Sequence, residues 1–307
     1  MEADKVQISQ LIDMENPQVV LDEVRAIVFM IFPEFDFAPA SCVFEDVARL
    51  FRGEYPGYRK CNTEYHDFKH ATDATLAMIR LIHGATLQGE AFSQKNITLG
   101  LISTLLHDTG YIQALDDDSG TGAKYTLVHI QRSIEFMDKY FKGKNFSRGD
   151  FQNCCDILKC TGLNTKIGEI QFKSREIELL GKMLGTADLL GQMSDRIYLE
   201  KLLFLFYEFR EGNVTGYTSE LGLLKKTLGF YDITKSRFAS ELGSVNRYLI
   251  YHFKKRWNID RDLYEEAIER SRNYLGYILA NHEKEYRERL RRGGIVKKLE
   301  GEDISQL

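Results

Sequence analysis

The chain has 307 residues and a formal net charge of −4, because 45 Asp and Glu outnumber 41 Lys and Arg. This balance disfavours nonspecific binding to nucleic acid, and no apolar run approaches the roughly 18 residues that a membrane span needs. The five cysteines are odd in number and lack paired metal-binding spacing, and no signal-peptide pattern opens the sequence. We therefore expect a cytoplasmic protein with free thiols.

Apolar residues recur at three- and four-residue spacing in eight segments, as amphipathic helices require. No proline follows Pro56, and no segment alternates with period two for long enough to predict a strand. The sequence therefore predicts an all-α protein, and the absence of a Pro-, Ser- or Gly-rich linker favours a single domain over 1–307. The predicted helices are 20–32, 71–83, 97–106, 127–141, 176–193, 196–209, 245–256 and 262–280.

The first chemically distinctive segment holds His66 and His70 and has the pattern of a helix start. Asn62 and Thr63 precede it and are candidate caps, while Asp67 adds acid near the positive helix end. If the segment is helical, two histidines four residues apart project from one face. His70 can then bind a metal while His66 reaches the substrate.

Two further segments supply matching groups. His107 and Asp108 follow the apolar segment 97–106, and Asp188 lies in the predicted helix 176–193. Together with His70 they offer two imidazoles and two carboxylates, a ligand set that suits Zn, Fe or Mn. Such a set leaves positions open for water and a phosphate oxygen, and bound water loses its proton near neutral pH. The predicted nucleophile is a metal-bound hydroxide.

His66 is not needed as a ligand, and a free imidazole that titrates near neutral pH suits the general acid that protonates a leaving alkoxide. Asp108 has a second oxygen, so it can bridge to a second ion such as Mg²⁺. Asp73, one turn after His70, is the expected acceptor for the other ring N–H of that ligand.

Less specific interpretations compete with each motif. A His-Asp dipeptide alone more often marks a polar helix end than a metal site, and only the combination of three segments favours the metal. The three consecutive aspartates at 116–118 are better explained as a solvated loop at the site entrance than as ligands, because runs of like charge avoid burial.

These residues resemble motifs of the HD-domain metal-dependent phosphohydrolases, and within them the class I 3′,5′-cyclic nucleotide phosphodiesterases. Segment 65–71, Tyr-His-Asp-Phe-Lys-His-Ala, is similar to the family's Tyr-His-Asn-x-x-His-Ala, in which the first His is the general acid and the second a metal ligand. His107 and Asp108 take the place of the paired ligands, and Ala-Asp-Leu at 187–189 resembles the element with the last one. The resemblance covers about 58–212.

The resemblance also suggests where substrate would bind. Tyr111 replaces a histidine near the family's second metal, and Thr161 lies in a stretch similar to its Ala-Thr-Asp-Met. The family's purine-binding glutamine has no counterpart in 240–251, where Asn246 is the available substitute. His129 fits either a second metal or phosphate contact, or a solvent-facing or core position. The candidate substrate-binding residues are Tyr111, His129, Thr161 and Asn246.

The resemblance implies a helical HD or phosphodiesterase-like core at about 46–212, with helices of 213–307 completing the pocket. It implies hydrolysis of a small phosphoester, most simply a cyclic nucleotide, with one or two divalent ions (Zn, Fe, Mn or Mg). An HD-type nucleotidase or phosphomonoesterase and a non-catalytic nucleotide sensor remain alternatives. The expected partner is a small-molecule phosphoester, most simply a nucleotide. Neither nucleic acid nor a membrane is expected as a partner, and a homodimer is left open.

Overall fold

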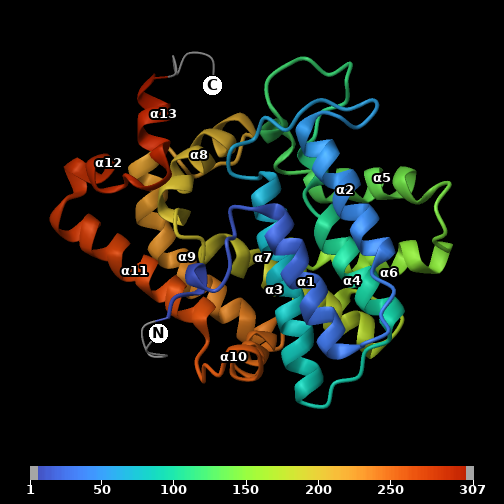
Figure 1. Cartoon of the computed structure of the whole chain (residues 1–307). Coiled ribbons are helices and arrows are strands. Elements are labelled where there is room, and N and C mark those ends of the chain that lie inside the picture. Colours follow the sequence, from blue (N-terminus) through green and yellow to red (C-terminus); the bar gives the residue numbers. More distant parts are fainter. Residues whose placement is uncertain (1–5, 302–307) are drawn as a thin grey trace.

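The computed structural model describes residues 6–301 and is built from helices. The α-helices, drawn in Figure 1, are α1 (Pro17–Ile31), α2 (Ala38–Arg52), α3 (Phe68–Leu87), α4 (Gln94–Leu106), α5 (His129–Phe141), α6 (Arg148–Lys159), α7 (Arg175–Met193), α8 (Tyr198–Glu211), α9 (Glu220–Ser240), α10 (Leu249–Trp257), α11 (Leu263–Asn281), α12 (Tyr286–Arg289) and α13 (Ile295–Gly301). Short 3₁₀ turns that matter below are η2 (Ile8–Gln10), η3 (Thr109–Tyr111), η4 (Gly122–Tyr125), η6 (Val245–Tyr248) and η8 (Arg292–Gly294). Within residues 6–301 the only β pairing is an isolated bridge between Tyr58 and Ala114.

The all-α prediction is confirmed, and each predicted helix has an observed counterpart. One is divided: the segment 245–256 begins as the 3₁₀ turn η6 before α10 starts at Leu249. Three long helices were not predicted, α2, α6 and α9. Pro39 occupies the second position of α2, and proline is tolerated in a first helical turn because the N–H groups there have no partner within the helix.

Helix α3 forms the centre of the molecule. Every residue from His70 to Ala85 is buried, and a helix that is enclosed on all sides must be covered by several neighbours. It contacts α1, α4, α7 and α10, which surround it in Figure 1. Its closest neighbour is α7, where a Cβ added at Gly191 would lie 2.9 Å from the backbone nitrogen of Ala74. The absence of a side chain at Gly191 therefore lets α7 approach the first turns of α3.

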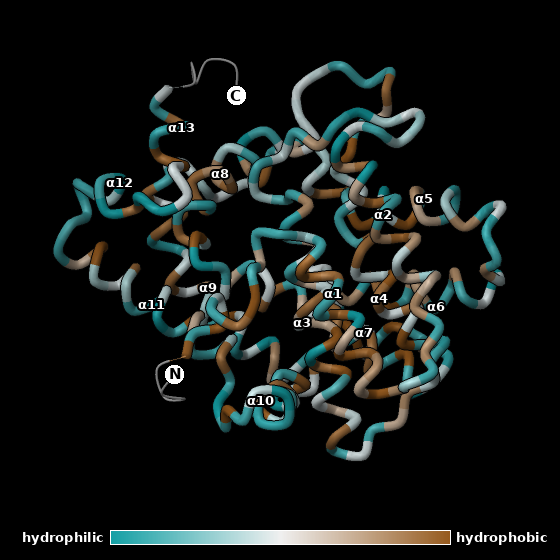
Figure 2. The backbone as a smooth tube through the Cα atoms, in the orientation of Figure 1, coloured by the Kyte–Doolittle hydropathy of each residue, from teal (hydrophilic) through white to brown (hydrophobic). Residues whose placement is uncertain are grey.

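The apolar side chains form two clusters that meet along α7. Ala187 and Leu190 belong to the larger cluster with α1 to α6, and Leu189 and Met193 to the smaller one with α8, α9 and α11. In Figure 2, hydrophobic residues are concentrated around α3, α4 and α7, and hydrophilic residues are more frequent along α11 and α12. Helix α7 therefore packs against both clusters.

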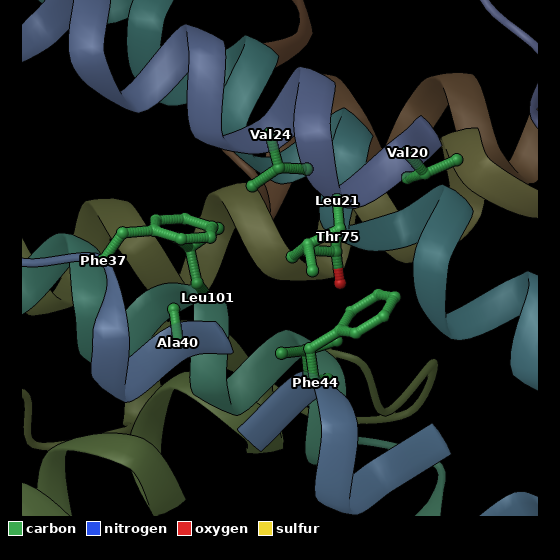
Figure 3. Close-up of a pocket in the computed structure, with 9 residues that line it drawn as sticks. Val20, Leu21, Val24, Phe37, Ala40, Phe44, Thr75 and Leu101 are labelled. Carbon is green, nitrogen blue, oxygen red and sulfur yellow. The ribbon is translucent and has the colours of Figure 1, made fainter. Parts of the chain in front are cut away.

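A small apolar cavity lies within the larger cluster, between α1, α2, α3 and α4. Figure 3 shows Val24, Phe37 and Phe44 around it, with Thr75 as the polar side chain. The Thr75 hydroxyl donates to the Ala71 carbonyl one turn earlier, so it is satisfied inside its own helix. This cavity is part of the core. No helix within residues 6–301 is both long and apolar enough to cross a membrane.

Candidate metal centre

The N-terminus of α3 fixes the positions of His66 and His70. Helix α3 begins at Phe68, and Asp67 is its N-cap, because Asp67 Oδ1 accepts the backbone N–H of His70 at 2.8 Å. The prediction that His66 lies on the same helical face as His70 is therefore wrong, since His66 precedes the helix. The cap predicted at Asn62 or Thr63 is also wrong. The two imidazoles still lie close together, with ring centroids 6.3 Å apart.

Three buried side chains and the partly buried side chain of Asp188 converge at one point. His70 comes from α3, His107 is the C-cap of α4, and Asp108 follows it. One donor atom of each of these three lies within 4.8 Å of the others, so the group could hold a metal ion. Asp188 of α7 completes the cluster, with its Oδ1 3.0 Å from His70 Nε2 and 3.6 Å from His107 Nε2. We call these four residues the His–Asp cluster.

The donor atoms of the cluster suit a cation. His107 Nδ1 donates to the Thr104 carbonyl at 2.7 Å, so in the neutral ring Nε2 carries the lone pair. That Nε2 faces His70 Nε2 at 3.2 Å and Asp108 Oδ2 at 3.3 Å. Asp108 Oδ2 is buried and has no hydrogen-bond partner in the described part of the chain. A buried carboxylate oxygen in that position is costly unless a positive charge balances it.

The surrounding hydrogen bonds differ from the predicted ones. His107 is oriented by its hydrogen bond to the Thr104 carbonyl. Asp188 is oriented by Gln192, whose Nε2 donates to Asp188 Oδ1 at 3.0 Å. Asp73 does not accept from His70: its Oδ2 binds Lys69 Nζ at 2.6 Å, and within residues 6–301 both His70 Nδ1 and Asp73 Oδ1 lack hydrogen-bond partners. A side chain one turn along α3 turns toward Lys69 because that ammonium lies on the same helix face at i−4.

The electrostatics of the cluster reflect its two carboxylates. Burial disfavours a charged imidazole, but the carboxylates of Asp108 and Asp188 outweigh it and hold the pKa of His107 well above its usual range. Burial likewise opposes ionisation of Asp108, yet the neighbouring imidazoles, His107 foremost, keep its pKa well below the ordinary value. The cluster therefore attracts positive charge, which a proton or a divalent cation can supply, and cation binding would release protons.

His66 lies beside the cluster and is held by an acid of its own. Its Nδ1 lies 2.6 Å from Oε2 of Glu208 in α8, whose Oε1 accepts the backbone N–H of Tyr65 at 2.7 Å. Burial lowers the pKa of His66, but the Glu208 carboxylate more than compensates, so the pKa of His66 is raised. Because the Glu208 carboxylate accepts a hydrogen bond from Nδ1–H, Nε2 is the ring nitrogen that remains for a ligand.

Tyr111 and His129 complete a stack of three rings. The Tyr111 ring lies parallel to His66 at a centroid distance of 4.2 Å and to His129 at 4.7 Å. His129 Nδ1 donates to the Thr126 carbonyl at 2.7 Å, and its Nε2 lies 3.9 Å from Asp108 Oδ1. Burial lowers the pKa of His129. The lowered pKa favours the neutral ring of His129. In that form its Nε2 carries a lone pair, and this nitrogen is the one that faces Asp108 Oδ1.

Close backbone contacts bring this stack to the cluster. A Cβ added at Gly110, two residues after Asp108, would lie 2.0 Å from the His129 carbonyl oxygen. The Gly110 N–H also donates to Ser133 Oγ at 2.8 Å, and Ser133 donates to the His107 carbonyl at 2.6 Å. The start of α5 is thereby fastened directly to the turn that carries the cluster.

The other two predicted substrate residues are less closely linked. Thr161 is buried, and its hydroxyl donates to the Leu158 carbonyl, although the next residue, Gly162, approaches Ile130 beside His129. Asn246 lies in η6, which packs near Gly84 at the far end of α3. Neither side chain hydrogen-bonds to the His–Asp cluster among residues 6–301. Both remain predictions.

Sequence reasoning missed the residues that orient the site. Glu208 and Gln192 act from α8 and α7, more than a hundred residues after His66. Both occur in amphipathic helical segments whose polar positions carry no motif. Periodicity places them on a helix but does not show which polar side chain turns inward.

Comparison with known proteins identifies a family for this chain. The family model described as Npun_R2479-like matches residues 57–242, which include His66 and the whole His–Asp cluster. No curated protein and no solved structure matches the chain significantly.

Proposed function

The chain belongs to the Npun_R2479-like family, and we propose that it is a metal-dependent phosphohydrolase acting on a small phosphodiester of the cyclic nucleotide class. The observation that carries the proposal is a protonatable imidazole, His66, held beside a buried His–Asp cluster without belonging to it. A cation site with a separate proton donor is what cleavage of a phosphate ester requires.

The proposed metal ligands are His70, His107, Asp108 and Asp188. Mixed nitrogen and oxygen donors suit Zn, Fe or Mn, and the spare oxygen of Asp108 with His129 Nε2 offers a start for a second ion such as Mg²⁺. When bound, such an ion polarises the phosphate and lowers the pKa of a coordinated water, which supplies the nucleophile. His70, His107 and Asp108 are buried, and the lower dielectric of a buried site strengthens these interactions.

His66 is proposed to protonate the departing oxygen. Glu208 holds its Nδ1 at 2.6 Å and raises its pKa, so a larger fraction of His66 carries two ring protons near neutral pH. The proton to be transferred is then on Nε2, which faces Tyr111 Oη at 3.4 Å. Tyr111 stacks on His66 and keeps the ring from rotating. Such general acids contribute roughly 10²–10⁴-fold to rate.

The Tyr111 ring has a histidine on each face, so the proposed phosphate contact on this side of the site is His129. No basic side chain hydrogen-bonds to the His–Asp cluster within the described residues, so the phosphate charge would be met by the bound ions rather than by Lys or Arg. This arrangement favours a substrate with a single phosphodiester charge over a triphosphate.

The test is hydrolysis of cyclic AMP, cyclic GMP, bis-p-nitrophenyl phosphate and p-nitrophenyl phosphate with Mn²⁺, Fe²⁺, Zn²⁺ or Mg²⁺. We expect turnover of a diester by the wild type, loss of it in Asp108→Ala, and no change in Asp116→Ala, a matched loop acid outside the cluster. Faster cleavage of the monoester would indicate a phosphomonoesterase instead. Bound metal with no turnover of any substrate would contradict a hydrolase and favour a sensor.

A further inference from the structure

A polar pocket separate from the His–Asp cluster lies where four segments meet: η2, the turn between α7 and α8, α11 and η8. Its volume is about 190 Å³, more than ten times the roughly 10–15 Å³ that one water needs. The side chains that matter are Ser194, Arg196, Glu200, Arg270, Tyr274 and Arg292, all of which line it. No member of the His–Asp cluster is among its lining residues.

Three guanidinium groups gather at this pocket. Arg196 is exposed, and its side chain forms no hydrogen bond or ion pair with the residues that the structure describes. Arg270 has only a long contact, 3.5 Å, with Glu266 Oε2. Arg292 Nη1 donates to the Arg196 carbonyl at 3.3 Å, so most of its donors also remain free. The three arginines come from three different segments of the chain, and their free N–H groups can bind one ligand in the pocket.

Three arginines line the pocket against two acidic side chains, and each acid has a contact inside the protein. Asp195 Oδ2 lies 3.1 Å from Lys69 Nζ. Glu200 is buried, which raises its pKa, and its Oε1 accepts the backbone N–H of Arg292 at 3.2 Å. The pocket as a whole therefore carries an excess of positive charge, which favours an anionic ligand.

A second, independent feature points to a ligand. Ser194 is only 6 % exposed, lines the pocket, and has an Oγ without a hydrogen-bond partner among residues 6–301. Burying a hydroxyl without a partner is unfavourable, and an acceptor oxygen in the pocket would satisfy it.

We propose that this pocket binds a phosphate-bearing small molecule. Arginine forks match the oxygens of a phosphate in pairs, and the resulting charge-assisted hydrogen bonds are the strong ones. The Ser194 hydroxyl would donate to another phosphate oxygen. The Arg292 guanidinium lies over the Tyr274 ring, 5.9 Å from its centroid, so this arginine and the ring form one wall of the pocket. The inference does not depend on the proposed hydrolase function, because it rests on other residues.

The test measures equilibrium binding of inorganic phosphate and of adenosine monophosphate to the full chain, kept free of metal by a chelator. The variants are Arg196→Gln, Arg270→Gln and Ser194→Ala. Arg291→Gln is the matched control, because Arg291 is exposed and adjacent in sequence to Arg292 but does not line the pocket. We expect each arginine variant to weaken binding by about tenfold or more and Ser194→Ala by a smaller factor.

The outcomes separate the two sites. Binding that persists in Asp108→Ala and without metal, and that falls in Arg196→Gln but not in Arg291→Gln, supports the pocket. Binding that disappears in Asp108→Ala, or that responds equally to Arg196→Gln and Arg291→Gln, overturns it, as does the absence of binding by the wild type. Circular dichroism of every variant excludes misfolding as the cause.

Discussion

At the scale of single residues, the site gives each imidazole a different environment. Two carboxylates raise the pKa of His107, burial lowers the pKa of His129, and His66 is paired with Glu208. Identical side chains can therefore perform different tasks, because burial and neighbouring charge set the pKa of each. We propose that the imidazole with its own carboxylate partner, His66, donates the proton.

Replacement of Glu208 tests that assignment. The carboxylate raises the pKa of His66, and a general acid must be protonated to act, so activity falls as the pH rises through that pKa. In Glu208→Gln the pKa of His66 falls, and we expect the descending limb of the pH–rate profile to move to lower pH. The measurement is kcat/KM against pH with unchanged metal content. A descending limb at the wild-type position would show that another group donates the proton.

At the scale of elements, the site depends on how closely backbones approach. Gly191 lets α7 lie against α3, and Gly110 lets the turn after α4 lie against the start of α5. These contacts bring Asp188 to His70 and the His129 ring to Asp108. A Cβ at either glycine would push apart the two segments that carry the site residues.

Gly110→Ala should therefore damage both stability and the site. Its Cβ would lie 2.0 Å from the His129 carbonyl oxygen, and overpacking of this kind typically costs about 1–3 kcal/mol. The matched control is Gly229→Ala in α9, where nothing lies within 4 Å and where alanine should stabilise the helix by about 0.5–1 kcal/mol. Urea unfolding measures both changes. Equal stability of the two variants would disprove the close contact.

The packing of α10 on α3 includes a second histidine pair. His83 Nδ1 lies 2.9 Å from His252 Nδ1, and both rings are buried. Burial, with help from Lys255 and Arg256, lowers the pKa of His83 to about 4. The ordinary value applies in the unfolded chain, so between about pH 6.5 and 4 the unfolded state binds more protons, and folding loses stability as the pH falls.

The double variant His83→Leu/His252→Leu should be less sensitive to acid than the wild type. We expect its free energy of unfolding to fall less between pH 7 and pH 5, because no imidazole at the helix contact gains a proton on unfolding. Comparing two proteins cancels the contribution of the many shared carboxylates. An equal fall in both would show that the pair is not what titrates.

At the scale of the whole molecule, the sequence predicted most of the helices but not the long-range contacts between them. Helical periodicity predicted α3, α4 and α7 because strongly apolar faces recur at helical spacing. It missed α9, which contains Gly222 and Gly229, and it placed His66 on a helix that starts two residues later. Motif spacing predicted that His70, His107 and Asp108 meet, as they do. The roles of Glu208 and Gln192 depend on long-range packing that local sequence does not encode.

A cation held by three helices should stabilise the folded chain as a whole. Binding to the folded state alone contributes about 2.7 kcal/mol at a ligand concentration 100 times Kd. We expect addition of Mn²⁺ or Zn²⁺ to raise Tm by several degrees and a chelator to reverse the rise, whereas Asp188→Ala should show little response. Calorimetry of both proteins checks this. An undiminished rise in Asp188→Ala would remove Asp188 from the ligand set.

The central claim is that a metal in the His–Asp cluster supports phosphodiester cleavage with His66 as proton donor. The most direct measurement removes metal with a chelator, adds Mn²⁺ stepwise, and records bound metal and bis-p-nitrophenyl phosphate turnover together for the wild type and His66→Asn. The account predicts wild-type turnover that rises with bound metal and then saturates, and a variant that binds the same metal with turnover lowered roughly 10²-fold or more. Wild-type turnover that does not depend on bound metal, or full activity in His66→Asn, would contradict it.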